Sequence, residues 1–298
     1  MKHKSGIVNL IGLPNVGKSS LLNALSEQKL SIVSHKPQTT RNRIRSIQNT
    51  EEYQIIWCDN PGVIDQPHYL MQESLNALNR EALTDSDILV LVVDSGYNQP
   101  QNDPLFEIMQ TAKVPTIVLL NKVDKLPKTA LAVIKSNLQL KLPNAKLFAV
   151  SALKPSTLKR FVQKVIKWLP EQPAFFDKEY ITDHNLRFLA AEMIREKIFL
   201  LLEDELPYCC FVAVTEYKES DTLDKIYATV FVERESQKKI FIGASGEMIR
   251  NIGTQARRDI ERFLDKRVFL EIQVKVKENW RNSPQILQQF GLKEGGAT

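Results

Sequence analysis

The chain is poor in the features that build membrane spans, disulfide frameworks and metal centres. None of its apolar runs approaches the roughly 18 residues that a membrane-spanning helix needs. Its three cysteines show neither zinc nor disulfide spacing, and its four histidines lie far apart without an acid and a nucleophile nearby. The opening MKHKSGIVNL passes directly from a short basic tail into an apolar strand, so we expect no secretory signal. These absences favour a soluble cytosolic protein with reduced thiols.

What the chain does contain is a glycine-rich phosphate-binding motif. GLPNVGKS, which starts at Gly12, fits G-x-x-x-x-G-K-[ST], follows an apolar strand predicted over 7–11 and opens an amphipathic helix predicted over 19–25. The glycines let successive backbone N–H groups turn inward, and the helix N-terminus adds the positive end of its dipole. We therefore expect the loop to hold a polyphosphate, with Lys18 reaching the β- and γ-phosphates and Ser19 ligating Mg²⁺.

A second motif, NKVD at residues 121–124, indicates which base the nucleotide has. An ionised Asp124 offers two acceptor oxygens to the adjacent N1 and N2 donors of guanine, and adenine has no such donor pair. Asn121 would tie this loop to the phosphate loop, and the aliphatic stem of Lys122 would cover the base. Because NKVD follows an apolar strand predicted over 116–120 and accompanies a phosphate loop, it predicts a guanine nucleotide.

The strand predicted over 53–58 ends in the tetrapeptide DNPG. In this D-x-x-G pattern, Asp59 can hold Mg²⁺ through water, and the Gly62 N–H can contact a γ-phosphate. The motif lies at the carboxyl end of a strand, where doubly wound sheets bind their ligands.

Two shorter segments are expected at the same site. Thr39 and Thr40 lie in a polar stretch where a threonine can add a second Mg²⁺ ligand only when a γ-phosphate is present. Ser151 and Ala152 follow a strand predicted over 146–150, and their backbone N–H groups could bind guanine O6. Ordinary loop is the alternative interpretation of both segments.

The first half of the chain alternates apolar strands with helical segments. Continuous apolar strands such as 88–93 are typical of strands buried on both faces, so we expect an α/β parallel sheet with helices on each side, closed by a helix over 158–169. Pro170, Pro173 and the aromatic and acidic run 175–183 interrupt this pattern and indicate a linker. With 43% hydrophobic residues, the chain is long enough to bury a second core.

Beyond the linker, the pattern predicts an α+β domain with the order α-β-β-α-β. We expect a long helix over 185–203, strands over 211–217 and 225–232, a short strand ending at Gly243, a helix over 247–264 and a last strand over 268–276. Neither internal repeats nor low-complexity tracts are visible.

Positive charge is unevenly distributed along this second half. Residues 171–298 have 19 Lys and Arg against 22 Asp and Glu, but from Arg234 to Arg281 the count is 12 against 7. Such a segment can present a positive face that neutralises phosphates, with a solvated helix face as the alternative interpretation. The tetrapeptide GASG at 243–246 lies within it, and its glycines would let the backbone approach a nucleic-acid strand closely.

The order of these motifs resembles that of the bacterial Era GTPases. The resemblance rests also on TTR at 39–41 and on the segments ITDHNLRFLAAEMIREK and VERESQKKIFIGASGEMIRNIGTQARRDIE, and it covers nearly the whole chain. It implies a Ras-like P-loop GTPase domain over 1–172 with a mixed, mostly parallel sheet, a linker over 173–184, and a type II KH domain with a C-terminal tail over 185–298. It also implies hydrolysis of GTP to GDP, binding of 16S ribosomal RNA near its 3′ end, and a role in assembly of the small (30S) ribosomal subunit.

Carried over residue by residue, the resemblance implies four sets of site residues: for the nucleotide, for Mg²⁺, for catalysis and for RNA. GTP or GDP would be bound through its phosphates by Asn15, Val16, Gly17, Lys18, Ser19, Ser20, Asp59 and Gly62, and through guanine by Asn121, Lys122, Asp124, Ser151, Ala152 and Leu153. Mg²⁺ would be held by Ser19, Thr40 and Asp59, and catalysis would involve Lys18, Thr40, Gly62 and Asn15. RNA would contact Lys238, Lys239, Gly243, Ala244, Ser245, Gly246, Arg250, Arg257 and Arg258.

Several single residues differ from the family's usual pattern or change the hydrolysis that we expect. Asn60 stands where Era-like proteins usually have threonine, and Ala244 and Ser245 leave the RNA loop without the Lys or Arg that often lies between its glycines. Val63 follows D-x-x-G where Ras-like enzymes have the glutamine that orients water, so we expect slow intrinsic hydrolysis. Asn15 resembles the asparagine that ligates K⁺ in related GTPases, which predicts stimulation by K⁺.

Two other functions stay open on the sequence alone. The chain could be an RNA-binding assembly factor that uses GTP as a structural ligand with little turnover, or a GTPase whose second domain docks on a protein or membrane partner. We expect a cytoplasmic monomer. Because basic patches attract anionic lipid as well as RNA, peripheral association with the inner face of the cell membrane is open too.

Overall fold

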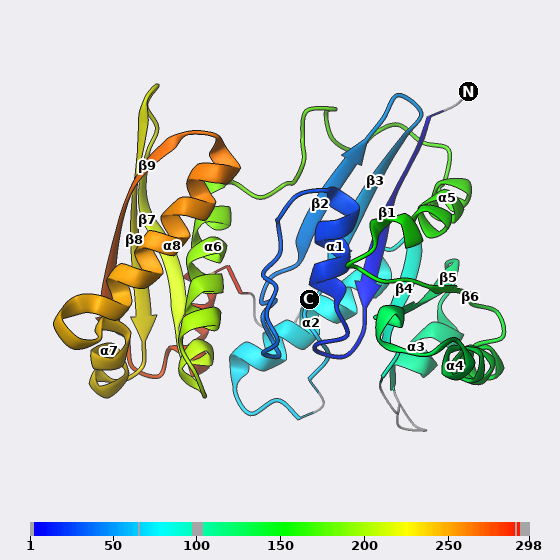
Figure 1. The fold of residues 1–298 in the computed structure, drawn as a ribbon, viewed down its shortest axis with the longest axis horizontal. Coiled ribbons are helices and arrows are strands. Elements are labelled where there is room, and N and C mark those ends of the chain that lie inside the picture. The colour runs from blue at the N-terminus through cyan, green and yellow to red at the C-terminus, as the bar shows by residue number, and fades with distance from the viewer. Residues whose placement is uncertain (1–2, 65, 97–103, 290, 293–298) are drawn as a thin grey trace.

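Two β-sheets, each covered by helices, lie side by side in the molecule (Figure 1). The structure is a computed structural model, and it describes residues 3–64, 66–96, 104–289 and 291–292. Among these residues the N-terminal sheet has six strands and the C-terminal sheet has three. Each sheet has its own hydrophobic core, so the chain divides its apolar residues between two layered units.

The N-terminal sheet is mixed but mostly parallel, as expected. Its strand order is β2-β3-β1-β4-β5-β6, and within it only β2 runs antiparallel to its neighbour. The strands are β1 (Lys4–Ile11), β2 (Ile44–Asn49), β3 (Tyr53–Asp59), β4 (Ile88–Asp94), β5 (Thr116–Asn121) and β6 (Lys146–Ala149). Parallel strands bring their carboxyl ends to one edge of a sheet, so the loops after β1, β3 and β5 meet there.

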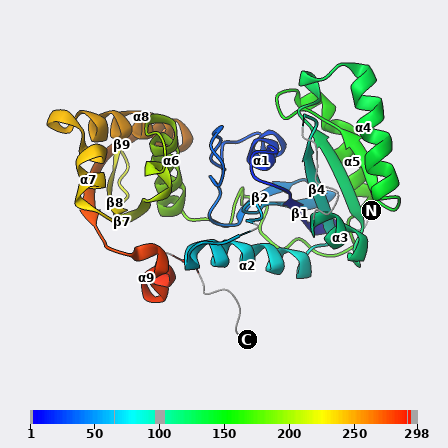
Figure 2. The same cartoon turned by 90° about the horizontal axis from the view of Figure 1, so that it is seen from below.

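Helices cover both faces of this sheet (Figure 2). One face is covered by α1 (Lys18–Ser26) and α5 (Lys159–Trp168), and the other by α2 (Leu70–Thr84), α3 (Pro104–Thr111) and α4 (Lys128–Lys141). Strand β4 shows how one sequence serves both faces. Val90 and Val92 belong to the core beneath α1 and α5, whereas Leu89 and Leu91 belong to the core beneath α3 and α4. Successive side chains of a strand point to opposite faces, so a continuous apolar strand is buried on both.

The C-terminal sheet has helices packed on one face. Strand β8 (Leu223–Val232) pairs antiparallel with β7 (Phe211–Lys218) and parallel with β9 (Arg267–Val276). Helices α6 (Leu186–Leu201), α7 (Glu235–Ile242) and α8 (Glu247–Leu264) supply the rest of the core, and a short helix α9 (Pro284–Gln289) follows. Ile194 and Ile198 of α6 meet Ile252 and Ala256 of α8 in this core. The two residues from each helix are four positions apart, so they lie on the same face of that helix.

The predicted short strand ending at Gly243 is wrong, because helix α7 takes its place. The observed order is therefore α-β-β-α-α-β. The Gln237 side chain accepts hydrogen bonds from the backbone N–H groups of Glu233 at 2.9 Å and Arg234 at 3.0 Å, which satisfies donors at the start of the helix. The apolar run 240–242 suggested a strand, but Ile240 is 49% exposed. A short apolar run does not distinguish a strand from a partly buried helix.

The segment between the two sheets lies along the outer edge of β2. The Ile47 N–H donates to the Ile181 carbonyl oxygen at 2.9 Å, and Thr182 Oγ1 donates to the Arg45 carbonyl oxygen at 2.6 Å. Because β2 is the last strand of its sheet, these contacts satisfy backbone groups that would otherwise face solvent.

Candidate functional site

The phosphate loop connects the end of β1 to the start of α1. Gly12 has φ +152° and Gly17 has φ +97°, values that residues with side chains rarely adopt. A Cβ on Gly12 would lie 2.5 Å from the Val92 carbonyl oxygen, and a Cβ on Gly17 would overlap the Asn121 amide. Both glycines are therefore required by the close approach of neighbouring strands as well as by the turn.

Lys18 lies beneath this loop and is almost fully buried. Its Nζ donates to the carbonyl oxygens of Gly12 at 2.9 Å and Leu13 at 3.0 Å. Burial lowers the pKa of Lys18 to about 8, and the Asp59 carboxylate opposes this shift. A polyphosphate in the loop would stabilise the charged ammonium, so this lysine is suited to binding one.

Ser19, Thr40 and Asp59 converge from three different segments. Ser19 Oγ donates to Asp59 Oδ2 at 2.7 Å and lies 3.0 Å from Thr40 Oγ1, which in turn donates to Asp59 Oδ2 at 3.2 Å. The second carboxylate oxygen, Asp59 Oδ1, is buried without a hydrogen-bond partner among the described residues. Burial raises the pKa of Asp59, while Lys18 and the hydroxyl groups oppose that shift. A carboxylate and two hydroxyls are ligands that fit Mg²⁺, and a cation would satisfy the unpaired oxygen.

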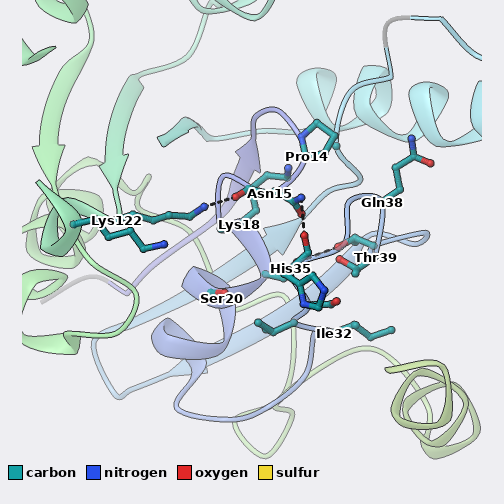
Figure 3. A pocket seen from close by; sticks show the side chains of 16 residues that line it. Pro14, Asn15, Lys18, Ser20, Ile32, His35, Gln38, Thr39 and Lys122 are labelled. Carbon is teal, nitrogen blue, oxygen red and sulfur yellow. Dashed lines mark hydrogen bonds between the residues drawn. The ribbon is translucent and has the colours of Figure 1, made fainter. Parts of the chain in front are cut away.

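A cavity of about 500 Å³ opens beside these residues (Figure 3). Asn15 Nδ2 donates to the His35 carbonyl oxygen at 3.0 Å, and Lys122 Nζ donates to the Asn15 carbonyl oxygen at 2.6 Å. The phosphate loop is thereby tied to the loops on either side of it. The cavity has the size of a small-molecule site. The predicted site residues that line it are Asn15, Gly17, Lys18, Ser19, Ser20, Thr40, Gly62 and Lys122.

The NKVD loop and the loop after β6 meet beside the phosphate loop. Asn121 Nδ2 donates to the Val16 carbonyl oxygen at 2.9 Å, and Asn121 Oδ1 accepts from the Ala152 N–H at 3.2 Å. Asp124 is exposed, and a hydrogen bond from Ser151 holds its pKa below the ordinary value. The carboxylate is therefore ionised at neutral pH and can accept from the two donors of guanine. The neighbouring Leu153 side chain is 79% exposed.

The loop after β3 approaches the phosphate loop at Gly62. A Cβ on this residue would lie 2.8 Å from Pro14 Cγ and 3.0 Å from Pro14 N. Glycine is therefore the residue that allows this approach. Val63, which follows, packs against the core beneath α3 and α4 and has no group that could orient a water molecule.

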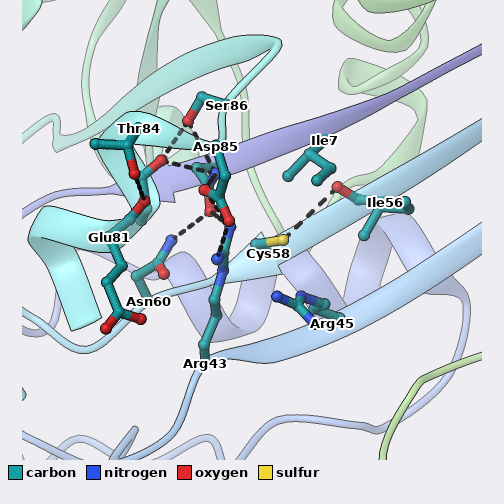
Figure 4. Close-up of polar contacts among 12 residues, drawn as sticks. Ile7, Arg43, Arg45, Ile56, Cys58, Asn60, Glu81, Thr84, Asp85 and Ser86 are labelled. Atoms are coloured by element: carbon teal, nitrogen blue, oxygen red, sulfur yellow. Dashed lines mark hydrogen bonds and ion pairs between the residues drawn. The ribbon is translucent and has the colours of Figure 1, made fainter. Parts of the chain in front are cut away.

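Asn60 links this loop to the protein interior (Figure 4). Its Nδ2 donates to Asn9 Oδ1 at 3.0 Å and to the Leu10 carbonyl oxygen at 3.2 Å. Asn9 Oδ1 also accepts from Arg43 Nη2 at 2.8 Å, and Arg43 pairs with Asp85 at 2.6 Å. One buried oxygen therefore joins the two segments that contain predicted Mg²⁺ ligands. A threonine at position 60 has one donor and could not make both amide contacts.

The loop that contains Thr40 is held by the C-terminal half of the chain. The Val33 N–H donates to Glu196 Oε1 at 3.3 Å. Lys36 is buried, and its Nζ donates to the Phe199 carbonyl oxygen at 2.9 Å, at the end of α6. These bonds anchor the first part of the loop to α6.

Arg41 anchors the other end of the same loop. Its guanidinium donates to the carbonyl oxygens of Pro207 at 3.2 Å, Tyr208 at 3.0 Å and Cys210 at 2.5 Å. Burial lowers the pKa of Arg41 to about 10, so the group is charged at neutral pH. Because Thr40 is the adjacent residue, the position of this predicted Mg²⁺ ligand depends on contacts with the second half of the chain.

Trp280 lies at the junction of the two halves and is fully buried. Its Nε1 donates to the Cys209 carbonyl oxygen at 3.1 Å, and the Arg41 guanidinium lies 6.0 Å from the ring centre. Trp280 also shares a hydrophobic cluster with Met71 and Leu75 of α2. One side chain therefore packs against both the Thr40 loop and the helix that follows DNPG.

The GASG loop at 243–246 connects α7 to α8, rather than a strand to a helix. Gly243 has φ +76°, Ser245 has φ +50° and Gly246 has φ +78°. A Cβ on Gly243 would lie 2.8 Å from Met248 Cβ, whereas nothing lies within 4 Å of a Cβ on Gly246. The loop is thus fixed at its first glycine and open at its last. Ala244 and Ser245 between them are exposed.

Cations flank this loop on both helices. The ion pairs that Lys238 and Arg257 form with acids on their own helices are 4.0 Å long, so they offset little of the positive charge. The predicted RNA contacts that are exposed or half-exposed are Lys238, Lys239, Arg250, Arg257 and Arg258.

Sequence reasoning missed several residues that shape the nucleotide site. His35 and Gln38 line the cavity. Lys36 and Arg41 anchor the Thr40 loop, which borders the cavity, to the second half of the chain. For Lys36 and Arg41, the only signal in the sequence is that long cationic side chains flank Thr39 and Thr40 in a polar stretch. A cation of this kind usually lies in solvent, so the pattern alone does not predict burial.

The three cysteines are buried free thiols. Burial raises the pKa of Cys58 to about 11 and that of Cys209 to about 12, so both are protonated at neutral pH. In the part of the chain that the structure describes, no helix combines the length and the apolar composition that crossing a bilayer requires.

The two halves of the chain match two different families. Residues 7–122 match a family described as 50S ribosome-binding GTPase, and residues 205–281 match the KH domain. The GTPase Era of Syntrophus aciditrophicus is 42% identical over 294 residues, covering 98% of this chain and 96% of the relative. The GTPase Era of Ruminiclostridium cellulolyticum is 40% identical over 296 residues, covering 98% and 99%.

Solved Era structures match both halves together. A point variant of Era from Aquifex aeolicus bound to GDP·AlF4⁻ gives a TM-score of 0.92 at 35% identity, covering 97% of this chain and 99% of that one. Era in complex with MgGDPNP and nucleotides 1506–1542 of 16S ribosomal RNA gives the same TM-score of 0.92 at 35% identity, covering 98% and 99%. Agreement of this size over nearly the whole chain includes the placement of the two sheets relative to each other.

Proposed function

This chain belongs to the Era family of GTPases, and on that premise we propose that it is a GTP-hydrolysing switch that binds 16S ribosomal RNA near its 3′ end and assists assembly of the small (30S) ribosomal subunit. The observation that carries the proposal is that one chain holds both a phosphate-loop cavity and a GASG loop flanked by cations. The Era structure that contains MgGDPNP and 16S ribosomal RNA supports the choice of ligands.

In the proposed nucleotide site, each group acts at a defined part of GTP. Backbone N–H groups of residues 15–20 bind the phosphates, and Lys18 supplies a charge beside them. Ser19, Thr40 and Asp59 would hold Mg²⁺, which would supply positive charge to neutralise the phosphates. The convergence of the Ser19 and Thr40 hydroxyls on one carboxylate oxygen of Asp59 supports their assignment.

The base is assigned to the NKVD loop and its neighbour after β6. Asp124 accepts from N1 and N2 of guanine, and Asn121 holds the two loops and the phosphate loop together. Lys122 Nζ donates to the Asn15 carbonyl oxygen of the phosphate loop, which supports assigning its aliphatic stem to cover the base. The backbone N–H groups of residues 151–153 are assigned as donors to guanine O6.

Hydrolysis in this site is proposed to be slow without a further charge. Val63 cannot position the attacking water, so the rate depends on charge compensation at the phosphates. We assign this role to K⁺ bound through Asn15, whose side chain already lies against the Thr40 loop at the His35 carbonyl.

The KH half is proposed to clamp single-stranded RNA at the GASG loop. Such a domain holds about four nucleotides against its glycine loop and reads base edges in the adjoining groove. The open space at Gly246 leaves room for a phosphate. Because the loop itself is uncharged, Lys238, Lys239, Arg250, Arg257 and Arg258 supply the attraction for the backbone.

Filter binding tests the RNA assignment. An RNA copying the 3′ end of the small-subunit ribosomal RNA is compared with its scrambled sequence at two salt concentrations. We expect preference for the native sequence and its loss in Gly246→Asp, because a carboxylate would then occupy the path of a phosphate. GTP affinity serves as the control and is expected to be unchanged. Equal affinities for both RNAs, unaffected by Gly246→Asp, would reduce this half to a nonspecific basic surface.

Phosphate release separates a switch from a factor that uses GTP as a structural ligand. We expect release to be slow for the protein alone and faster with the 3′-end RNA. Turnover that stays negligible with RNA, Mg²⁺ and K⁺ all present would favour the structural role instead.

The division of the chain into 1–172, 173–184 and 185–298 is part of the same proposal. Its support is that each sheet has a core of its own, although Leu189 of α6 packs into the N-terminal one, and that the connecting segment lies along the edge strand β2. We further infer a cytoplasmic monomer, the compartment being that of the proposed ribosomal RNA ligand. Sedimentation of the purified protein with and without RNA tests the oligomeric state.

A further inference from the structure

One continuous stretch of the chain has no acidic residue. Residues 125–170 contain ten Lys and Arg and no Asp or Glu. At the average of the whole chain, which has 35 acidic residues in 298, a stretch of this length would hold about five. Outside it, the chain has 30 basic residues against 35 acidic ones and is net negative. The positive net charge of the whole chain, +5, therefore depends on this stretch.

In the fold, this stretch forms one flank of the N-terminal sheet. It consists of α4, the edge strand β6 and α5, with their connecting loops. Figures 1 and 2 both place α4 and α5 at the end of the molecule opposite to α7. We call residues 125–170 the cationic flank. It lies far from the GASG loop, so the two positive regions are separate surfaces.

The described cations of the flank are exposed or half-exposed, and the acid beside them is Asp124 at its border, next to Lys125 and Lys154. Lys146, Lys159, Arg160 and Lys167 are exposed. None of the flank cations whose side chains are described forms an ion pair with a described carboxylate. Many other exposed cations do, such as Lys178 with Glu51 at 2.5 Å. Uncompensated like charges repel one another, and a polyanion would relieve that repulsion.

The side chains between these cations indicate which polyanion fits. The exposed side chains of α5 are Lys159, Arg160, Gln163 and Lys167; Phe161 and Val165 are buried in the core, and Val162, Ile166 and Trp168 are partly buried against it. A membrane-surface helix needs an apolar face to insert, and single-stranded RNA needs exposed aromatic rings for stacking. Exposed α5 side chains offer neither. On α4, Val133 and Leu140 are exposed, but the polar Ser136 and Asn137 lie between them, so they do not form a continuous apolar face. Double-helical RNA is recognised mainly through its phosphates and shape, which a row of long cations suits.

We propose that the cationic flank binds the phosphate backbone of double-helical RNA, as a second RNA contact distinct from the GASG loop. The inference rests on the proposed function in placing the protein on ribosomal RNA. A clamp on a single-stranded end at one extremity and a duplex contact at the other would fix the orientation of the GTPase domain on its particle, which one flexible contact cannot do. The flank supplies affinity without sequence preference.

The test removes two exposed flank cations that have no role in the nucleotide site. The double variant Arg160→Gln, Lys167→Gln is compared with Lys178→Gln, Lys218→Gln, which loses the same charge at exposed lysines already paired with Glu51 and Glu216. The probe is an RNA duplex of about 16 base pairs with an unrelated sequence. We expect the flank variant to lose roughly ten- to fiftyfold in affinity near 0.1 M salt and its log-affinity against log-salt slope to flatten by up to about 2. The control is expected to match the parent.

Three outcomes would overturn the inference. Equal losses in the flank and control variants would mean that net charge alone matters. An unchanged duplex affinity would mean that the flank does not bind RNA. Loss of binding to phosphatidylglycerol vesicles with duplex binding intact would assign the flank to lipid, and Val133 and Leu140, exposed on α4, would then be the inserting residues. Single-stranded 3′-end RNA serves as a further probe: its binding should depend on Gly246→Asp and not on the flank, so failure of the KH assignment is distinguishable.

Discussion

At the scale of single residues, the nucleotide site depends on opposite charges that are kept close together and away from water. Burial disfavours the charged forms of both Lys18 and Asp59, lowering one pKa and raising the other, and each charge stabilises its partner. Polyphosphate and Mg²⁺ would add charge of the complementary sign to each. Electrostatic interactions are stronger in such a low-dielectric setting than at an exposed surface. The affinity of the site for polyphosphate and Mg²⁺ should therefore depend strongly on whether Lys18 and Asp59 are charged.

The identity of the base is tested at Asp124. In Asp124→Asn, one acceptor becomes a donor that faces the donors of guanine, so we expect GTP affinity to fall about a hundredfold or more. Xanthosine triphosphate, which presents an acceptor at that position, should recover binding. Competition against a fluorescent GTP analogue measures both. A variant that binds GTP as tightly as the parent would show that this loop does not hold guanine.

The pKa of Lys18 predicts a pH dependence of GTP binding. The group has a pKa of about 8 in the free protein, and phosphates would raise that value in the complex. Binding above pH 8 therefore takes up a proton, and affinity should fall by up to tenfold per pH unit as pH rises from there. Calorimetry with GDPNP in buffers of different ionisation enthalpy measures the proton uptake. Lys18→Met is the control, because it retains only the titration of the ligand. The same slope in both proteins would contradict the assignment.

Asn15 predicts a selective response to monovalent cations. If its side chain ligates K⁺ beside the phosphates, hydrolysis should be faster in KCl than in NaCl at equal ionic strength. Asn15→Ala should remove the difference while leaving the slow basal rate. Equal rates in the two salts, or an undiminished K⁺ response in the variant, would exclude this role.

At the scale of elements, the sequence predicted well those that its periodicity marks and poorly those that tertiary contacts decide. β4 and β5 are continuous apolar runs, and the phosphate loop has a fixed spacing, so both could be located. Strand β2 has polar residues at Arg45, Gln48 and Asn49 and gives no such signal; it forms because it pairs with β3. The end of helix α7 gives a strand signal in the sequence, because its one buried residue, Phe241, lies in a short apolar run.

The Thr40 loop is the element whose structure depends most on the rest of the chain. Nothing in the sequence of residues 33–41 predicts that Lys36 and Arg41 donate to backbone carbonyls more than 150 residues away. The motif located the predicted Mg²⁺ ligand, but the contacts that hold it come from the other half of the protein. Regulation of the site by RNA could therefore act through this loop.

Arg41→Ala tests that dependence. Losing hydrogen bonds from a buried charge should displace Thr40, which is expected to ligate Mg²⁺ only when a γ-phosphate is present. GDPNP affinity should fall about tenfold or more, whereas GDP affinity should change little. Arg45→Ala, which removes an arginine of strand β2 that is paired with Asp183 of the connecting segment, is the matched control. A variant that weakens both nucleotides equally would show that Arg41 stabilises the fold without positioning Thr40.

At the scale of the whole molecule, the two-unit division could be predicted from the break in pattern near Pro170, but the contacts between the units could not. Those contacts join residues such as Lys29 and Glu196, which form an ion pair across the junction. Lys29 belongs to no motif, and Glu196 lies in the segment 181–197, whose resemblance to a family predicts no contact for it. The cationic flank shows the same limit, because ten dispersed cations form a surface only after α4, β6 and α5 are placed together.

The linker predicts a difference between two truncated chains. A chain ending at residue 172 lacks the segment that lies along β2, so an edge strand faces solvent, whereas a chain ending at residue 184 retains it. We expect the shorter chain to self-associate as concentration rises, because unpaired edge strands recruit one another. Analytical ultracentrifugation of both chains measures this. Identical behaviour would mean that the linker has no protective role.

Trp280 gives the molecule an optical consequence of its architecture. The chain has three tryptophans: Trp57 lies in the core of the N-terminal sheet, Trp168 stacks with Lys164, and Trp280 alone lies at the junction with a guanidinium beside its ring. Indole emission moves to longer wavelength when water reaches the ring. With Trp57→Phe and Trp168→Phe in place, the colour of the remaining fluorescence would follow the separation of the two halves in real time, with no attached dye.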